Sequence, residues 1–510
     1  KLLSYKDSYY QKLESQRKYV VETVGEKESQ IVQAHMEILD DPELFDSIKK
    51  KIEKEHMNLV MAIDETRKFF LSLFAGIDDP YIRERSKDID DVTSGWMKVA
   101  LGIVDHQLSQ IKKSTIIFAK DLNPSDTMQL NESIEGIVLQ EGSLTSHTAI
   151  VAKAKGIPTI VAYDGELPKE DDLVILDSHT TQIFYQPEEL LLREYRKKQQ
   201  MESEKHQELK KIRDKQAITL DGHHIEIVGN VGSAMETEAM IKNGGFGVGL
   251  LRTEFVYMNS SHWPTEEEQY KEYLDIAKKA NGEVIIRTLD IGGDKMLPYY
   301  EFHKEENPFL GLRAIRFCLK NPGIFKTQLK AILRVSAKYP VKIMFPMISH
   351  LEELRQAKEI LEEVKLELRK EAMDFNEKIP VGIMVEIPSV VYVMDLFAKE
   401  VDFVSIGTND LCQYTLAVDR LNPEVSYIYD GMNISILRMI AQVVKACHYE
   451  RVKVGVCGEL AGDVNSALVL VGLGVDELSM SPSMIPTVKE NILKSYYSDL
   501  QVKSKERIEC

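Results

Sequence analysis

The segment around His147 contains the side chain with the clearest capacity for chemistry. Small polar residues lead into it and an Ala-rich stretch follows. Thr145 or Ser146 is a natural N-cap and Gly156 a natural stop, so the pattern predicts a short helix with His147 in its first turn. Free N–H groups and the helix dipole favour an anion there and disfavour an imidazolium. A neutral imidazole beside an anion site can be a nucleophile toward phosphorus, although a capping surface histidine fits the same residues.

Three arginines follow apolar stretches that are typical of buried strands. Arg252 and Arg287 each end such a stretch, and Arg313 lies in the loop after the second. In a barrel of parallel strands, the carboxyl ends of the strands form the active-site face. Three arginines at that face suit a substrate with several anionic oxygens, phosphate and carboxylate together. A single one would more simply be a surface ion pair.

Two carboxylates and a thiol follow later apolar stretches. Glu386 and Asp410 come after neighbouring stretches, and acids at adjacent strand ends can share one divalent cation such as Mg²⁺. Ion pairs with the arginines are the alternative. Cys457 ends a third stretch, where a thiol can give or take a proton or be buried and inert. Together these groups would polarise a phosphorylated three-carbon acid, pass its phosphoryl group to His147 and protonate the enolate left behind.

The elements that must position these side chains follow residue 217. Apolar stretches alternate there with amphipathic segments, and eight βα units over about 290 residues match a (β/α)8 barrel, with an open doubly wound sheet as the alternative. The predicted strands are 225–231, 247–251, 284–288, 343–347, 381–386, 402–407, 452–457 and 476–480, and the predicted helices include 266–280, 323–338, 350–374, 388–399 and 433–448.

Before the barrel the sequence predicts a multidomain α/β chain of three further parts. Residues 1–105 have apolar residues at helical spacing, and the Asp-Pro pairs at 41–42 and 79–80 are typical of helix starts, so we expect a helical bundle. Its His35 is a lone histidine on a helix and is most simply structural. Residues 106–186 predict a small α/β domain, with strands at 115–119, 134–139, 159–162, 173–176 and 182–185. The charged segment 187–216 predicts a linker helix, and the barrel occupies 217–510.

Composition indicates which classes of partner and which cellular compartment fit the chain. The chain has 510 residues, 28% of them charged, and a formal net charge of −17, which argues against nucleic acid or an anionic membrane as main partner and allows a basic protein. No apolar run is long enough to span a bilayer. Five scattered cysteines without a Cys-x-x-Cys pair indicate a reducing compartment and neither zinc nor disulfides. We therefore expect a cytoplasmic protein.

Six motifs, in order along nearly the whole chain, resemble the enzyme I family of the bacterial sugar phosphotransferase system, whose members are phosphoenolpyruvate–protein phosphotransferases. The motifs are Thr145–Thr148, Gly249–Glu254, Arg287–Lys295, Glu306–Gly311, Val404–Leu411 and Gly455–Gly462. The resemblance implies that His147 accepts the phosphoryl group of phosphoenolpyruvate, releasing pyruvate, and hands it to a histidine on the histidine-containing phosphocarrier protein, as the first step of sugar uptake.

The resemblance also assigns site residues and partners. Arg252, Arg287, Arg313 and Arg420 would hold the substrate, with Asn409 and Lys295 in the same site; Glu386 and Asp410 would bind Mg²⁺, and Cys457 would protonate enolpyruvate. The helical bundle would dock the carrier through residues 35–41, whose acids suit a basic partner. The family forms a homodimer through the barrel.

Two departures from the family pattern concern the histidine domain. The family's motif usually begins Gly-Gly, often followed by Arg, whereas this chain has Gly142-Ser143-Leu144, which removes one cation near the histidine and puts the rate in question. The family's leading segment, with a strand of this domain, is absent before Lys1, so we expect the domain to lack that strand.

Other functions fit parts of the sequence. A pyruvate phosphate dikinase or phosphoenolpyruvate synthase shares the histidine and barrel domains, but it needs a nucleotide-binding domain, and no Gly-x-x-x-x-Gly-Lys loop occurs here. A regulatory module that only binds phosphoenolpyruvate or a carrier would not need the complete barrel set. A Mg²⁺-dependent barrel lyase would leave the histidine domain unexplained.

Overall fold

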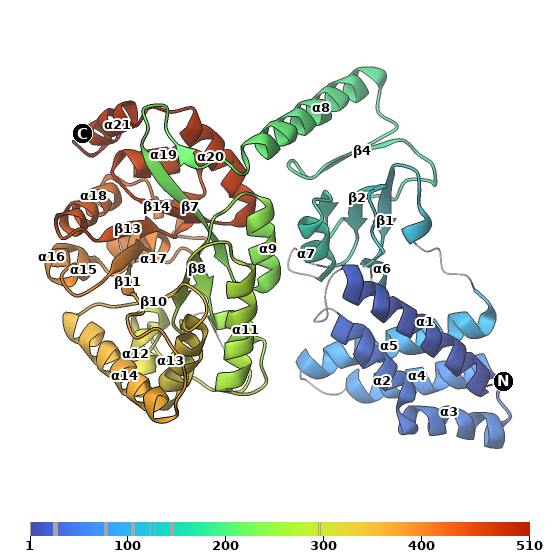
Figure 1. The fold of residues 1–510 in the computed structure, drawn as a ribbon. Helices are drawn as coiled ribbons and strands as arrows, with labels where there is room; N and C mark the ends of the chain where they lie inside the picture. Colours follow the sequence, from blue (N-terminus) through green and yellow to red (C-terminus); the bar gives the residue numbers. More distant parts are fainter. Residues whose placement is uncertain are drawn as a thin grey trace. The chain divides into compact units, whose positions relative to one another are not determined.

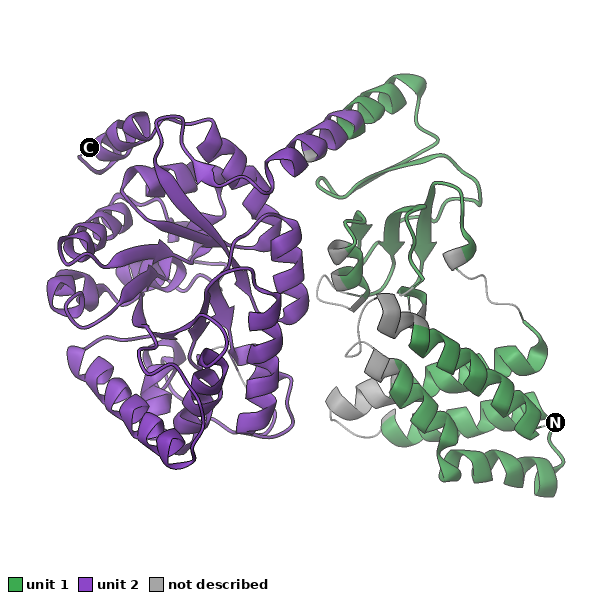
Figure 2. Cartoon of the chain, in the orientation of Figure 1, with its two compact units in different colours: residues 1–199 green, residues 200–510 purple. Residues whose placement is uncertain are grey.

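The computed structural model describes residues 2–23, 29–75, 80–103, 108–122, 124–127, 129–142, 147–293, 295 and 297–509. The chain divides into two compact units, residues 1–199 and 200–510 (Figure 2). The division falls inside one long, charged helix, α8 (Glu189–Ile212), in the segment predicted as a linker helix.

The described residues before 104 are helical, as predicted, and form α1 (Leu2–Thr23), α2 (Ser29–Asp40), α3 (Pro42–Glu55), α4 (Leu59–Ala75) and α5 (Pro80–Leu101). The break after Asp40 arises because Asp41 caps α3, accepting hydrogen bonds from the N–H groups of Glu43 and Leu44 at 2.7 and 3.3 Å. The second predicted start, at Pro80, begins α5, while Asp79 lies outside the described residues. His35 is buried, 3.4 Å from Asp88, which agrees with a structural role.

The rest of the first unit is a small α/β fold. Strands β1 (Thr115–Ala119), β2 (Ile134–Leu139) and β3 (Thr159–Ile160) form a parallel sheet in that order, and β4 (Val174–Asp177) pairs antiparallel with β5 (Gln182–Tyr185). The 3-10 turn η1 (Leu108–Gln110) precedes β1, and α6 (Pro124–Thr127) and α7 (His147–Ala154) lie between the parallel strands. All five predicted strands are confirmed, with β3 two residues shorter than expected.

The second unit is a closed barrel of eight parallel strands (Figure 1). The strands are β7 (His224–Val231), β8 (Val248–Arg252), β9 (Val284–Arg287), β10 (Val341–Phe345), β11 (Val381–Val385), β12 (Phe403–Ile406), β13 (Lys453–Val456) and β14 (Glu477–Met480). Pairing of β14 with β7 closes the ring and excludes the open sheet, and the short β6 (Ala217–Ile218) adds to β7 in antiparallel fashion. Strand β10 was predicted at 343–347 and lies two residues earlier, at Val341–Phe345.

Helices surround the barrel. They are α9 (Ala234–Lys242), α10 (Glu254–Met258), α11 (Glu266–Lys279), α12 (Ile315–Lys320), α13 (Pro322–Ser336), α14 (Leu351–Lys370), α15 (Pro388–Tyr392), α16 (Met394–Phe397), α17 (Thr408–Leu416), α18 (Ile434–Tyr449), α19 (Val464–Gly472), α20 (Ile485–Leu493) and α21 (Tyr497–Glu509), with short 3-10 turns at 308–310, 426–428, 459–461 and 482–484. The single helix predicted at 388–399 is divided at Val393, where β-branched and aromatic neighbours favour helix weakly. Within the described residues, no helix is both long and apolar enough to cross a membrane.

Alternation along the strands decides which side chains reach the site. Leu250, Ile285, Met344, Met384, Phe403 and Cys457 form a separate buried cluster, which we place in the barrel interior. Side chains two positions further along a strand share the same face. The next inward positions toward the carboxyl ends are therefore Arg252, Arg287, Glu386 and Ser405.

Candidate active site

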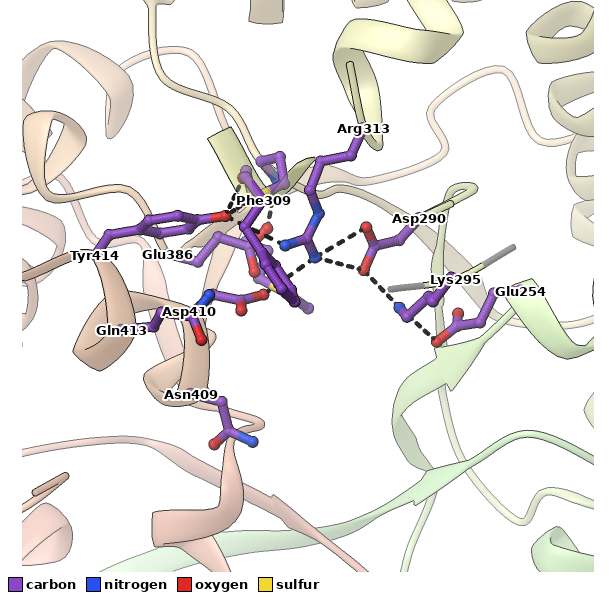
Figure 3. A network of polar contacts seen from close by, with 12 residues as sticks. Glu254, Asp290, Lys295, Phe309, Arg313, Glu386, Asn409, Asp410, Gln413 and Tyr414 are labelled. Atoms are coloured by element: carbon purple, nitrogen blue, oxygen red, sulfur yellow. Dashed lines mark hydrogen bonds and ion pairs between the residues drawn. The ribbon is translucent and has the colours of Figure 1, made fainter. Parts of the chain in front are cut away.

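A buried ion network organises the carboxyl ends of β8 and β9 (Figure 3). Asp290 is 1% exposed and pairs with Arg287 at 3.2 Å, Lys295 at 2.9 Å and Arg313 at 3.2 Å. Glu254, on α10, pairs with Arg287 at 2.8 Å and Lys295 at 3.1 Å. Burial alone would raise the pKa of Asp290, but the three cations hold it well below its usual range. The network therefore consists of charged groups fixed in place before any substrate arrives.

Asp410 continues this network toward α17. Its Oδ2 lies 3.3 Å from Nη2 of Arg313, and Arg420 Nη1 is 4.0 Å from its Oδ1. That Oδ1 is buried and accepts no hydrogen bond in the described part of the chain. A buried carboxylate oxygen without a donor is costly unless something else binds it.

Glu386, at the end of β11, is a second unusual carboxyl group. It is 1% exposed and accepts a hydrogen bond from the N–H of Met347, whose φ is +57°. Burial first, and then the charges of Asp410 and Asp290, raise the pKa of Glu386 to about 8. Mutually repelling oxygen donors of this kind fit a hard divalent cation. Among the described residues, no three His, Cys, Asp or Glu side chains are grouped closely enough to hold a metal ion.

Two predicted residues have partners outside the Asp290 network. Arg252 Nη2 lies 3.3 Å from Glu236, and its guanidinium is 5.0 Å from the Phe255 ring. Asn409 was expected beside the arginines. In the structure its side-chain amide donates to Glu459 at 2.9 Å and accepts from the Glu459 N–H at 2.9 Å. Figure 3 shows Asn409 apart from the contacts of Arg313.

Cys457 follows β13 and is 5% exposed, with its Sγ 3.7 Å from the carbonyl oxygen of Ile406. Burial raises the pKa of this thiol to about 12. The group therefore stays protonated at neutral pH, which suits a proton donor and does not suit a nucleophile.

His147 is the first residue of α7 in the other unit. The neighbouring Thr148 is buried and donates to the carbonyl oxygen of Leu122 at 3.0 Å, which fixes the start of the helix. Gly156, with φ +72°, ends the helical stretch as predicted. The predicted N-cap residues Thr145 and Ser146 lie outside the described residues, as does the position of the His147 side chain.

Several residues of the network were not predicted as site residues. Glu254 and Asp290 follow strand ends inside the quoted motifs, so their position alone could have identified them. Gln328 on α13 had no such signature. It is fully buried, accepts from the N–H of Leu289 at 2.8 Å and donates to Thr253 at 3.1 Å. Tyr414 on α17 contacts Arg313 at 3.2 Å.

The chain is similar to known proteins along most of its length. The sequence matches three family models, described as the N-terminal part of PEP-utilising enzymes over residues 7–85, their mobile domain over 111–181 and their PEP-binding domain over 206–497. The phosphoenolpyruvate-protein phosphotransferase of Priestia megaterium is 44% identical over 96% of this chain and 86% of its own length. This chain belongs to that family.

Further relatives agree. Proteins of the same name from Bacillus subtilis and Staphylococcus carnosus are 43% and 42% identical, over 95% and 96% of this chain and 86% of each relative. The resemblance found from the six motifs is thereby confirmed. The mobile-domain match contains α7 with His147, and the PEP-binding match contains the barrel strands with the Asp290 network.

Proposed function

We propose that this chain transfers the phosphoryl group of phosphoenolpyruvate to His147 and then to a histidine on the histidine-containing phosphocarrier protein, releasing pyruvate. The observation that carries the proposal is the buried set of arginine donors at the barrel mouth, inside the match to the PEP-binding domain. In the described part of the chain, Nε of Arg252, Arg287 and Arg313, and Nη1 of Arg420, are buried without a hydrogen-bond acceptor. Phosphate and carboxylate oxygens would supply the missing acceptors.

The protein holds these donors in fixed directions. Other N–H groups of Arg287 pair with Glu254 and Asp290, and those of Arg313 pair with Asp290 and Asp410. The two guanidinium groups therefore do not need to reorganise when an anion binds. We place Lys295 in the same substrate site, and Asn409 at its edge beside Glu459. Glu386 and Asp410 would hold Mg²⁺, because Asp410 has a buried oxygen without a hydrogen-bond donor in the described part of the chain and Glu386 has a raised pKa. When bound, this cation would polarise the substrate's oxygens.

The chain's own residues then account for both halves of the reaction. A neutral His147 attacks phosphorus, so that a P–N bond forms while the P–O bond to the enol oxygen breaks. The electron pair of that bond leaves with enolpyruvate. Cys457 donates its proton to the terminal carbon, which gives pyruvate, and the thiolate regains a proton from water.

The remaining parts of the chain would serve the transfer to the carrier. We assign residues 1–105 to carrier docking, 106–186 to the phosphohistidine domain, 187–216 to the linker and 217–510 to substrate binding. The exposed acids Glu37, Asp40 and Asp41 would suit a basic partner, whereas His35 of the same segment is buried against Asp88 and would not contact it. The four described cysteines are free thiols, which fits a reducing cytoplasm.

We also propose that two copies pair through the barrel. Large apolar side chains are exposed on and around α15 to α18, namely Tyr392, Leu396, Leu421, Tyr427 and Ile428. A group of exposed apolar side chains in one part of a surface favours an interaction surface there.

Intact mass spectrometry tests the proposed reaction. We expect the chain to gain one phosphate when it is mixed with phosphoenolpyruvate and Mg²⁺, and to lose it when excess pyruvate is added. ATP with Mg²⁺ should give no gain. Failure of phosphoenolpyruvate to phosphorylate the folded chain would contradict the proposal, and phosphorylation by ATP would favour a dikinase.

A further inference from the structure

Tyr414 connects the helix that carries Asp410 to the loop that carries Arg313 (Figure 3). Its hydroxyl accepts a hydrogen bond from Nη1 of Arg313 at 3.2 Å and donates one to the carbonyl oxygen of Phe309 at 2.7 Å. A phenol has one proton to donate and lone pairs to accept, so both bonds form together. We propose that Tyr414 is a positioning residue that sets the direction of Arg313 and fixes the loop 305–313 to α17.

The contacts of Arg313 show why this hydroxyl matters. Nη2 of the guanidinium is held by Asp290 at 3.2 Å and Asp410 at 3.3 Å, and Nη1 is held by Tyr414. The buried Nε has no acceptor in the described part of the chain. Because the guanidinium is planar, fixing both terminal nitrogens fixes the direction of the Nε–H that remains for a ligand.

The loop 305–313 also makes hydrogen bonds within itself and with the start of α12. Glu305 accepts from the N–H of Leu312 at 3.0 Å, and Arg316 donates to the carbonyl oxygen of Leu310 at 2.9 Å. Gly292 lets the chain pass closely, since a Cβ there would lie 2.7 Å from the carbonyl oxygen of Leu312. These contacts hold the loop to neighbouring residues of the β9–α12 connection and to α12, whereas the Tyr414 bond to Phe309 and the Arg313–Asp410 ion pair join it to α17. Loss of the hydroxyl would therefore release Nη1 of Arg313 and loosen the loop at once, with the Arg313–Asp410 ion pair still in place.

The effect of Tyr414 on phosphoenolpyruvate binding rests on the proposed function, whereas the effect of Tyr414 on the loop 305–313 does not. The variant Tyr414→Phe keeps the ring and removes the hydroxyl. Tyr299→Phe is the matched control, because Tyr299 lies in the same β9–α12 connection and donates one hydrogen bond to a backbone carbonyl, that of Tyr257 at 2.9 Å, without contacting an arginine.

Two measurements on the full chain decide the matter. In Tyr414→Phe we expect the amides of residues 310–313 to exchange hydrogen about tenfold faster without ligand, and KM for phosphoenolpyruvate in the phosphorylation assay to rise about tenfold with a smaller change in kcat. Tyr299→Phe should show neither effect, and the two variants should have similar thermal midpoints.

Each other outcome overturns part or all of the inference. If Tyr414→Phe matches Tyr299→Phe in both measurements, the hydroxyl has no positioning role. Faster exchange with an unchanged KM would contradict the role in orienting Arg313. If wild-type protein is not phosphorylated by phosphoenolpyruvate, the proposed function fails, and the exchange measurement still decides whether Tyr414 fixes the loop.

Discussion

The hydroxyl of Thr253 donates a hydrogen bond to the carbonyl oxygen of Arg287 at 2.8 Å, directly after the last paired residues of β8 and β9. Gln328 completes this link, because it donates to the same hydroxyl oxygen and accepts from the N–H of Leu289. Two strand ends that deliver Arg252 and Arg287 are thus held in register by side chains beyond the ladder. The link is fully buried, so its bonds do not compete with water.

Replacing Gln328 with Leu should therefore damage the site as well as the fold. The change leaves the Leu289 N–H unpaired in a buried layer, and we expect a loss of about 2–3 kcal/mol in the free energy of unfolding. We also expect kcat/KM for phosphoenolpyruvate to fall at least about tenfold, since misplacing the strand ends misdirects the arginines. Ser336→Ala, on the same helix, is the control and should leave kcat/KM near the wild-type value. Equal kinetic effects of both variants would contradict this role.

Cys457→Ser should separate phosphoryl transfer from proton transfer. A serine hydroxyl is a far weaker acid, so exchange of the pyruvate methyl protons with D2O should slow at least about 100-fold. Single-turnover phosphorylation by phosphoenolpyruvate should change much less. Buried Cys447 provides the control, and Cys447→Ser should leave both rates unchanged. Equal loss of both rates in Cys457→Ser would contradict the assignment of the proton donor.

The same thiol predicts a pH profile. Burial raises its pKa from 9 to about 12, so the proton donor stays protonated up to about pH 11. The pH profile of the protonation step should therefore show no loss of the acid form between pH 6 and 10. A fall in rate centred near pH 9 that disappears in Cys457→Ser would show a thiol of ordinary acidity.

In the helical part, Asp91 should make stability fall as pH rises. Burial, with the charges of Asp90 and Asp88 added, raises its pKa from 3.8 to about 6, against the opposing effect of His35. The folded state then binds a proton that the unfolded chain has lost, so the free energy of unfolding decreases between about pH 4 and 6 and is level above. Asp91→Asn should stabilise this part by about 1 kcal/mol at pH 7, allowing for solvent screening.

Urea unfolding followed by Trp96 fluorescence, in a Trp263→Phe background, measures this effect. Trp96 is buried among the helices of the same part of the chain. The exposed Asp46, on α3, gives the control variant Asp46→Asn, which should leave the pH profile as it is. A profile for Asp91→Asn that is parallel to wild type would contradict the prediction.

The proposed dimer can be tested by placing a charge on the exposed apolar surface. Tyr427→Glu puts a carboxylate at a position in the 3-10 turn 426–428 where the tyrosine is 82% exposed, and we expect the dissociation constant from analytical ultracentrifugation to rise at least about tenfold. Tyr449→Glu, at the C-terminal end of α18, replaces an equally exposed tyrosine and should have no such effect. A wild-type chain that is monomeric at micromolar concentration would contradict the pairing itself.

Much of the barrel could be predicted because most strands are short apolar runs, several of them ended by a polar residue such as Arg252, Arg287 or Glu386. Strand β10 was misplaced by two residues, since Lys342 interrupts its apolar run and pairs with Glu283. Asn409 was predicted in the motif after the sixth strand, but its partner Glu459 lies 50 residues away. Gln328 is 39 and 75 residues from its partners. Such contacts depend on how distant elements pack, which local spacing does not contain.

The proposed reaction requires that His147 carries the phosphoryl group. The most direct measurement is the phosphate taken up from labelled phosphoenolpyruvate by wild type, His147→Ala and His179→Ala, where His179 is a second histidine of the same α/β domain. We expect one acid-labile phosphate in wild type and in His179→Ala, and none in a folded His147→Ala. Retained uptake in His147→Ala would contradict the proposed reaction.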